Sequence, residues 1–213
     1  MYVSDWMTKK VVTIGPDDYV SDAITLMKEG GIKHLPVVKG DKLKGIISDR
    51  DIKEYTPSKA TCLDVYELHY LLAKTKIKEL MITKVITTAP DTPVEEAAMV
   101  LLDRNIDCLP VLDGGSLVGI ISDRDIFHAL VDITGVRHGG HRVCATVEDR
   151  PGSIRELADI IRRHDFHLHG ILTSYEGVKD GFRRVVIRTT EKGDFKGLKA
   201  DLEANYRNVD ILK

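Results

Sequence analysis

Apolar and polar residues follow the same pattern twice in the first two-thirds of the chain. In the first copy, a β-branched run at residues 11–14 precedes apolar positions at helical spacing between Val20 and Met27. Two apolar runs within residues 35–47, separated by a Gly-Asp-Lys turn, then predict a pair of strands. The pattern therefore predicts strand, helix, strand and strand, with a further helix that begins at Ser48.

The second copy lies 74 residues further along the chain. The sequence Gly-Ile-Ile-Ser-Asp-Arg-Asp-Ile occupies residues 45–52 and again residues 119–126, and Leu-Pro-Val at 35–37 returns at 109–111. Landmarks repeated in one register indicate two copies of one supersecondary unit. The predicted elements of the second copy begin with a strand at residues 85–88.

Local signals predict where the first helix of each copy begins. In the first copy, Asp17 or Asp18 can cap a helix that runs to about Glu29 and ends at the Gly30-Gly31 pair. In the second copy, residues 92–95 read Thr-Pro-Val-Glu, a capping box with proline at the first helical position.

The Ser-Asp-Arg-Asp motifs at residues 48–51 and 122–125 can serve two purposes. In each motif the serine and the last aspartate are three residues apart, the spacing of a capping box. A helix N-terminus also suits phosphate, and Arg50 and Arg124 add a charged fork for phosphate oxygens. The aspartate offers two acceptor oxygens, enough for both hydroxyls of a ribose. Helix capping and nucleotide binding are compatible alternatives.

The chain divides into five segments. The two repeats occupy residues 1–55 and 79–132, and a leucine-rich helical insert lies between them at 56–78. We expect this insert to pack on another surface, and a partner subunit is one candidate. A glycine-rich linker at 133–140 precedes a separate unit at 141–213. This last unit has the pattern β-α-β-β-α-β of the ferredoxin-like fold. Its elements are expected at residues 142–147, 153–163, 166–174, 183–189, 195–204 and 209–212.

The composition, 43% apolar and 30% charged residues, is that of an ordinary globular protein. The net charge of −2 argues against a general nucleic-acid binder, which is usually basic. The first residues lack an apolar signal-peptide core, and no apolar run approaches the roughly 18 residues of a membrane span. Cys62, Cys108 and Cys144 form no CxxC pair, which favours free thiols in a reducing compartment. We therefore expect a cytoplasmic protein with neither a membrane nor a nucleic-acid partner.

The doubled unit resembles a pair of CBS domains, small ligand-sensing modules that associate as a pseudo-twofold disc, the Bateman module. The family pattern combines a strand ending in Ser/Thr-x-x-Asp with a hydrophobic-x-hydrophobic-Pro strand. Here the first part is residues 48–51 and 122–125, and the second is residues 32–36 and 106–110. The resemblance covers residues 1 to about 132 and implies a mixed α/β fold for this part of the chain.

The resemblance also implies two ligand clefts, in which aliphatic residues enclose a purine and the Ser/Asp pair binds ribose and phosphate. The first cleft would contain Val12, Ile32, Lys33, His34, Pro36, Ile120, Ser122, Arg124 and Asp125. The second would contain Ile86, Ile106, Asp107, Cys108, Pro110, Ile46, Ser48, Arg50 and Asp51. Because Asp107 is a poor neighbour for a polyphosphate, we expect unequal affinities. The alternative for His34 is an ordinary surface residue.

The Asp-x-Pro-Gly-Ser turn before the amphipathic helix of the last unit resembles the ACT domain, a ferredoxin-like module that often binds amino acids between two copies. The implied pocket would contain Asp149, Arg150, Pro151, Gly152, Ser153 and His167. Many amino-acid-binding members have asparagine in the second strand, whereas residues 165–169 here read Asp-Phe-His-Leu-His. Amino-acid binding and dimerisation alone are therefore two alternatives for this unit.

We expect no metal site, cofactor or catalytic site. His167 and His169 share a strand face, which suits zinc or nickel, but no cysteine or carboxylate pattern completes a site, so solvated or interface histidines are favoured. The sequence has no Ser-His-Asp order and no P-loop lysine. The Ser/Asp pairs have no general base beside them that would activate a nucleophile.

The order of a CBS pair and an ACT domain resembles the bacterial acetoin-utilisation regulatory proteins. This resemblance implies a homodimeric, non-enzymatic sensor that binds an adenosine-containing nucleotide (AMP, ADP, ATP, NAD or S-adenosylmethionine) and acts on an unidentified downstream protein. One alternative is a structural adaptor with ligand-free clefts. The other is a metabolic enzyme acting on acetoin or a nucleotide.

Overall fold

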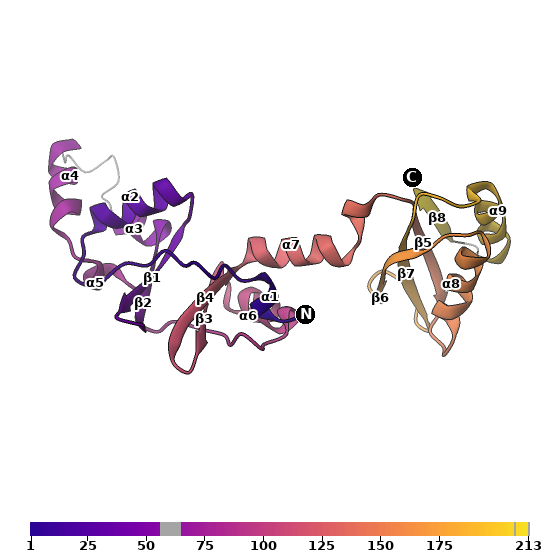
Figure 1. The fold of residues 1–213 in the computed structure, drawn as a ribbon, viewed down its shortest axis with the longest axis horizontal. Coiled ribbons are helices and arrows are strands. Elements are labelled where there is room, and N and C mark those ends of the chain that lie inside the picture. Colours follow the sequence, from indigo (N-terminus) through magenta and orange to yellow (C-terminus); the bar gives the residue numbers. More distant parts are fainter. Residues whose placement is uncertain (56–64, 207, 213) are drawn as a thin grey trace. The chain divides into compact units, whose positions relative to one another are not determined.

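The computed structural model describes residues 1–55, 65–206 and 208–212. They form two compact units, Met1–Phe127 and His128–Lys213 (Figure 1). Residues 56–64 of the expected leucine-rich insert, and Cys62 with them, lie outside the described residues. Within the described ranges, no helix is both long enough and apolar enough to cross a bilayer.

The first repeat contains two helices around a β-hairpin. Its elements are α2 (Val20–Gly30), β1 (His34–Lys39), β2 (Lys42–Ser48) and α3 (Asp49–Tyr55). The hairpin is antiparallel, with Leu35 opposite Ile47, and both side chains are fully buried. The helix α4 (Val65–Lys74) follows, and its Leu72 packs into the core of the same repeat. The predicted order of helix, strand, strand and helix is confirmed.

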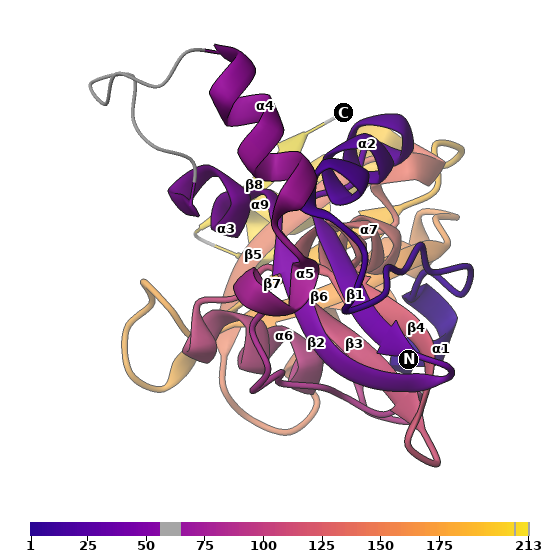
Figure 2. The same ribbon diagram turned by 90° about the vertical axis from the view of Figure 1, so that its left-hand side faces the viewer.

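The second repeat has the same construction, as the repeated sequence predicts. Its elements are α6 (Val94–Arg104), β3 (Cys108–Asp113), β4 (Ser116–Ser122) and α7 (Asp123–Ile133). The β3–β4 hairpin has its register shift between Val111 and Leu112, and the β1–β2 hairpin has the equivalent shift between Val37 and Val38. The strands β2 and β4 lie side by side (Figures 1 and 2), which joins the repeats.

Two short helices exchange between the repeats. The helix α1 (Val3–Trp6) precedes the first repeat, yet Val3 is buried in the core of the second, with Leu109 and Ile121. The helix α5 (Ile77–Leu80) precedes the second repeat, yet Ile77 is buried in the core of the first. Neither core is complete without a segment from the other repeat, so the two repeats form one packed unit.

The strands predicted at residues 11–14 and 85–88 are wrong, because only one residue of each segment pairs. Ile14 bridges to Val37 and Thr88 bridges to Val111, both in parallel. The Ile14 N–H donates to the Pro36 carbonyl at 3.1 Å, and the Gly15-Pro16 turn follows at once. Since proline has no N–H to donate, pairing cannot continue along the sheet.

The predicted helix caps are also displaced. The helix α2 begins after Tyr19, and the Asp18 carboxylate accepts a hydrogen bond from the Gly15 N–H at 2.7 Å instead of capping it. The Thr92 hydroxyl likewise accepts from the Ala89 N–H at 3.3 Å, one residue too early to cap α6. Short polar side chains can accept hydrogen bonds from the backbone of a nearby turn instead of capping a helix. The Asp18 and Thr92 side chains both do so.

The second unit is a four-stranded antiparallel sheet with two helices on one face (Figure 1). Its elements are β5 (Arg142–Glu148), α8 (Ser153–Arg163), β6 (Leu168–Ser174), β7 (Phe182–Thr189), α9 (Phe195–Asn205) and β8 (Val209–Leu212). The strand order is β6-β7-β5-β8. This order, and the alternation β-α-β-β-α-β, are compatible with the predicted ferredoxin-like arrangement.

Candidate functional site

The Ser-Asp-Arg-Asp motif of each repeat forms the N-terminus of a helix. In the second repeat, Asp125 Oδ2 accepts hydrogen bonds from the Ser122 N–H at 2.8 Å and the Ser122 hydroxyl at 2.7 Å. In the first repeat, Asp51 Oδ2 accepts from the same groups of Ser48 at 2.7 and 2.6 Å. The predicted capping box is complete in the first repeat, where the Ser48 hydroxyl also accepts from the Asp51 N–H at 3.2 Å. In the second repeat, the contacts of the Asp125 carboxylate with Ser122 confirm the aspartate part of the box. Each carboxylate is held by one oxygen, and Asp125 Oδ1 has no hydrogen-bond partner in the described part of the chain.

A cavity of about 650 Å³ lies beside the N-terminus of α7. Its walls come from the segment after α1, the connection between α2 and β1, the start of β3, and the junction of β4 and α7. The lining residues are Thr8, Lys10, Val11, Val12, Gly31, Ile32, Lys33, His34, Asp107, Cys108, Ile120, Ser122, Asp123, Arg124, Asp125 and Phe127. The cavity brings together every residue assigned to the first cleft except Pro36, which is buried in β1 opposite Ile46.

Two residues assigned to the second cleft, Asp107 and Cys108, line this same cavity, which corrects their assignment. Cys108 is paired with Ser122 across the β3–β4 hairpin. The Asp107 carbonyl accepts a hydrogen bond from the Asp123 N–H at 3.0 Å. The start of β3 therefore lies directly against the start of α7, so its side chains face the first cavity.

The remaining second-cleft residues are not among those that line this cavity. Ser48 and Asp51 form the cap of α3, and Ile46 exchanges backbone hydrogen bonds with Ile82 at 2.9 and 3.0 Å. Pro110 is buried opposite Ile120, Ile106 packs against the core of the second repeat, and Ile86 is 38% exposed. Arg50 points from α3 toward Asp107, at 3.6 Å.

Several residues that line the cavity were not predicted from the sequence. Thr8, Lys10 and Val11 reach the cavity because Thr8 and Ile120 exchange backbone hydrogen bonds at 2.9 and 3.1 Å, a tertiary contact that no local signal predicts. Phe127 has a local signal, since it lies three residues after Arg124 and so on the same face of α7. Its side chain is 63% exposed, unusual for an aromatic residue.

Burial alters two titratable groups of the cavity. It lowers the pKa of His34, and the Asp107 carboxylate, 3.8 Å from His34 Nε2, acts in the opposite direction with a smaller effect. Burial also raises the pKa of the Cys108 thiol to about 12. At pH 7.5, both His34 and Cys108 are therefore uncharged.

In the second unit, an arginine reaches the predicted ligand-binding turn. Gly152 has a φ of 90° just before α8, and the turn contacts Arg183 of β7. Arg183 Nε lies 3.4 Å from Asp149 Oδ1, and its Nη2 donates to the Ser153 hydroxyl at 3.2 Å. Arg150 forms ion pairs with two glutamates instead. The Arg183 guanidinium thus contacts both ends of this turn, at Asp149 and Ser153.

The six residues predicted for this turn do not form one pocket. Arg150 and Ser153 line an open cavity of about 1480 Å³ along α8, whereas Asp149, Pro151 and Gly152 lie in the turn itself. The inclusion of His167 was wrong: its backbone pairs with Thr190, at the other end of β7 from Arg183. The antiparallel path of β6 and β7 causes this separation.

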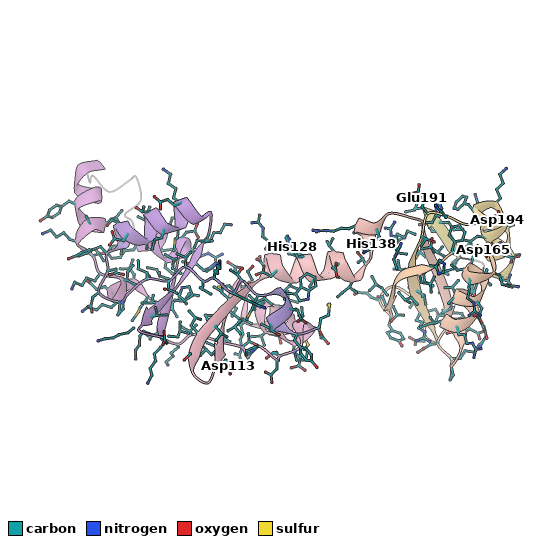
Figure 3. All side chains as sticks on the ribbon, in the orientation of Figure 1. Asp113, His128, His138, Asp165, Glu191 and Asp194 are labelled. Atoms are coloured by element: carbon teal, nitrogen blue, oxygen red, sulfur yellow. The ribbon has the colours of Figure 1, made fainter. Side chains whose placement is uncertain are left out.

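The histidines near the start of β6 do not form a three-ligand cluster. His169 stacks on His138, which is labelled in Figure 3, with ring centroids 5.0 Å apart. Across the described residues, no three His, Cys, Asp or Glu side chains gather closely enough to hold a metal ion.

Comparison with known sequences identifies the doubled unit. The CBS domain family model matches residues 3–58 and 77–132. The CBS domain-containing protein YhcV of Bacillus subtilis is 31% identical over 124 residues, which cover 58% of this chain and 81% of YhcV. The inosine-5′-monophosphate dehydrogenase of Korarchaeum cryptofilum is 28% identical over 188 residues, 85% of this chain but only 35% of that enzyme.

Solved structures give the same result. An acetoin utilization protein (AcuB) from Vibrio cholerae superposes with a TM-score of 0.55 and 31% identity, over 64% of this chain and 95% of that one. CBSX2 in complex with AMP gives a TM-score of 0.52 and 29% identity, over 62% and 97% of the two chains. The CBS domain pair of protein MJ0100, with 5′-methylthioadenosine and S-adenosyl-L-methionine, gives 0.50 and 29%, over 61% and 95%. With both repeats matched over more than half of its length, the chain belongs to the CBS domain family.

Proposed function

We propose that this protein is a regulatory sensor that binds an adenosine-containing nucleotide in the cavity beside α7. The observation that carries the proposal is the cavity itself, which joins aliphatic side chains, a positioned carboxylate and a helix N-terminus. Val12, Ile32 and Ile120 would enclose the adenine. Asp125 Oδ1 would accept from the ribose hydroxyls, and the start of α7 with Arg124 would bind a phosphate.

The complexes of similar proteins support the ligand class. CBSX2 was solved with AMP, and the MJ0100 pair with two adenosine derivatives. We propose the corresponding chemistry here, with adenosine as the shared part. A second site at Ser48 and Asp51 stays a prediction from the family resemblance.

We propose a non-enzymatic role. Asp125 Oδ2 holds the Ser122 N–H and hydroxyl in the cap of α7, which leaves Oδ1 to accept from a diol. We propose that these groups bind a ligand and do not catalyse a reaction. Ligand binding would instead change the balance between two arrangements of the protein, which requires that the ligand bind one arrangement more tightly than the other. The match to a dehydrogenase covers only 35% of that enzyme and supports no turnover here.

We propose that residues 141–213 form an ACT domain whose role is dimerisation. The strand β6 lies at the edge of the sheet, with Leu168 37% and Ile171 41% exposed. An unpaired edge with apolar side chains can pair with a second copy. The contacts of Arg183 with Asp149 and Ser153 in the predicted ligand-binding turn favour dimerisation over amino-acid sensing. Sedimentation of wild type and Ile171→Glu tests this role: a dimer that dissociates in the variant supports it, and a wild-type monomer contradicts it.

Thermal unfolding with a ligand panel tests the sensor. The panel contains AMP, ADP, ATP, NAD, S-adenosylmethionine and the amino acids. A ligand at 100 times its Kd adds about 2.7 kcal/mol of stability, which is a shift on the order of 5–10 °C for a domain of this size. We expect such a shift from at least one adenosine ligand. No shift from any nucleotide would favour an adaptor, and a shift from an amino acid would restore amino-acid sensing.

A further inference from the structure

Asp107 lies at the start of α7, beside the expected phosphate position of the proposed ligand site. Its carbonyl accepts from the N–H of Asp123, the first residue of α7, at 3.0 Å. Its side chain lines the cavity and is 48% exposed. Ser122 and Arg124, where a ligand phosphate would lie, belong to the same junction. A carboxylate therefore lies next to the expected phosphate position.

The fixed charges of the cavity balance one another. Its cations are Lys10, Lys33 and Arg124, and its carboxylates are Asp107, Asp123 and Asp125. A site for a nucleoside triphosphate would be expected to carry a surplus of positive charge, because the ligand brings several negative charges. This cavity has no such surplus.

Two of the three carboxylates, Asp125 and Asp123, accept hydrogen bonds at the start of α7, whereas no such bond holds the Asp107 carboxylate among the described residues. Asp125 accepts from the Ser122 N–H and hydroxyl, and Asp123 Oδ1 accepts from the Arg124 N–H at 2.6 Å. Among the described residues, the basic groups nearest the Asp107 carboxylate are His34 Nε2 at 3.8 Å and Arg50 Nη2 at 3.6 Å, and neither distance is that of a hydrogen bond. The charge of Asp107 can therefore act on a ligand.

Neither neighbour cancels this charge. Arg50 Nη2 lies 3.6 Å from the carboxylate but is 67% exposed, so water screens the pair. Burial lowers the pKa of His34, which is neutral at pH 7.5. Asp107 thus presents its negative charge to the cavity under physiological conditions.

We propose that Asp107 is a specificity-determining residue that limits the negative charge of the bound ligand. The cavity would then select an adenine nucleoside or nucleoside monophosphate over the di- and triphosphate. This inference rests on the proposed function, and it names the ligand class within it.

Titration calorimetry with adenosine, AMP, ADP and ATP tests the inference, on the full chain at pH 7.5 without divalent cations. In wild type, we expect ATP to bind about tenfold or more weakly than AMP, as expected for uncompensated like charges at short range. Asp107→Asn should tighten ATP binding about tenfold and change adenosine binding less than twofold. Asp107→Glu keeps the charge and should retain the wild-type order.

The matched control is Asp113→Asn, which removes the same charge at the tip of the β3–β4 hairpin, away from the cavity (Figure 3). This variant should also retain the wild-type order. Equal binding of AMP and ATP by wild type would overturn the inference while leaving the proposed function intact. So would an Asp107→Asn variant that binds all four ligands with the wild-type ratios. If none of the four ligands binds any variant, the inference fails. The proposed function fails with it if NAD and S-adenosylmethionine also leave thermal unfolding unchanged.

Discussion

Single residues of the cavity illustrate what a sequence can and cannot reveal. The capping contact of Ser122 and Asp125 was predictable, because both partners lie within one turn of the chain. The place of Asp107 was not, because it depends on the start of β3 packing against the start of α7. The repeat pattern gives the two strands and the helix, but the family resemblance assigned Asp107 to the wrong cleft.

His34 makes stability depend on pH. Burial holds its pKa in the folded state below the unfolded value of about 6.5. Below that pH the unfolded state binds more protons, so this contribution to stability is present above pH 6.5 and is lost as pH falls through the folded pKa. We expect the free energy of unfolding to fall less steeply between pH 6.5 and 5 in His34→Gln than in wild type.

Urea unfolding at several pH values measures this difference. His128→Gln is the matched control, because it removes an exposed histidine from α7 (Figure 3). The control should follow the wild-type curve. Identical slopes for wild type and His34→Gln would contradict the account of His34.

At the level of elements, the repeated sequence predicted the hairpins and the long helices. Its predictions were wrong or missing for segments whose conformation depends on tertiary contacts. The runs at residues 11–14 and 85–88 have strand composition, yet each turns away after one paired residue. The exchange of α1 and α5 between the repeats gives no local signal either. Each short helix has two polar residues and buries one apolar side chain, Val3 or Ile77, in the core of the other repeat.

Equivalent glycines show how this exchange constrains the repeats. Gly45 and Gly119 occupy the same place in β2 and β4. A Cβ at Gly45 would lie 2.8 Å from both the Ile82 carbonyl oxygen and the Met81 sulfur, whereas the three atoms nearest a Cβ at Gly119 all belong to the flexible side chain of Met7. A methionine side chain can move, but a paired backbone carbonyl cannot.

We therefore expect Gly45→Ala to destabilise the protein by about 1–3 kcal/mol, the usual cost of overpacking. Gly119→Ala should cost less, because Met7 can adopt another rotamer. Chemical denaturation of the two variants in parallel measures both values, and each variant controls for the other. The expectation fails if Gly119→Ala is the more damaging substitution.

At the scale of the whole molecule, the proposed ligand binding and the proposed dimerisation belong to different units. The unit Met1–Phe127 contains the cavity and two cores that share exchanged helices. The unit His128–Lys213 has its own core between one sheet face and two helices. The glycine-rich linker and the change of hydrophobic pattern made this division predictable. The boundary itself was not, because α7 (Asp123–Ile133) runs across it.

Calorimetric titration of AMP into wild type, Asp125→Ala and Asp51→Ala tests the central claim most directly. The two substitutions remove equivalent caps, of α7 and of α3, so a loss of about 1 kcal/mol of stability is expected in both. Only Asp125 lines the cavity. We predict that Asp125→Ala weakens AMP binding to the cavity beside α7 at least tenfold, through lost charge-assisted hydrogen bonds. Asp51→Ala should change the affinity of that cavity less than twofold, whatever it does to AMP binding at the predicted second site. Wild-type affinity in folded Asp125→Ala would contradict the account.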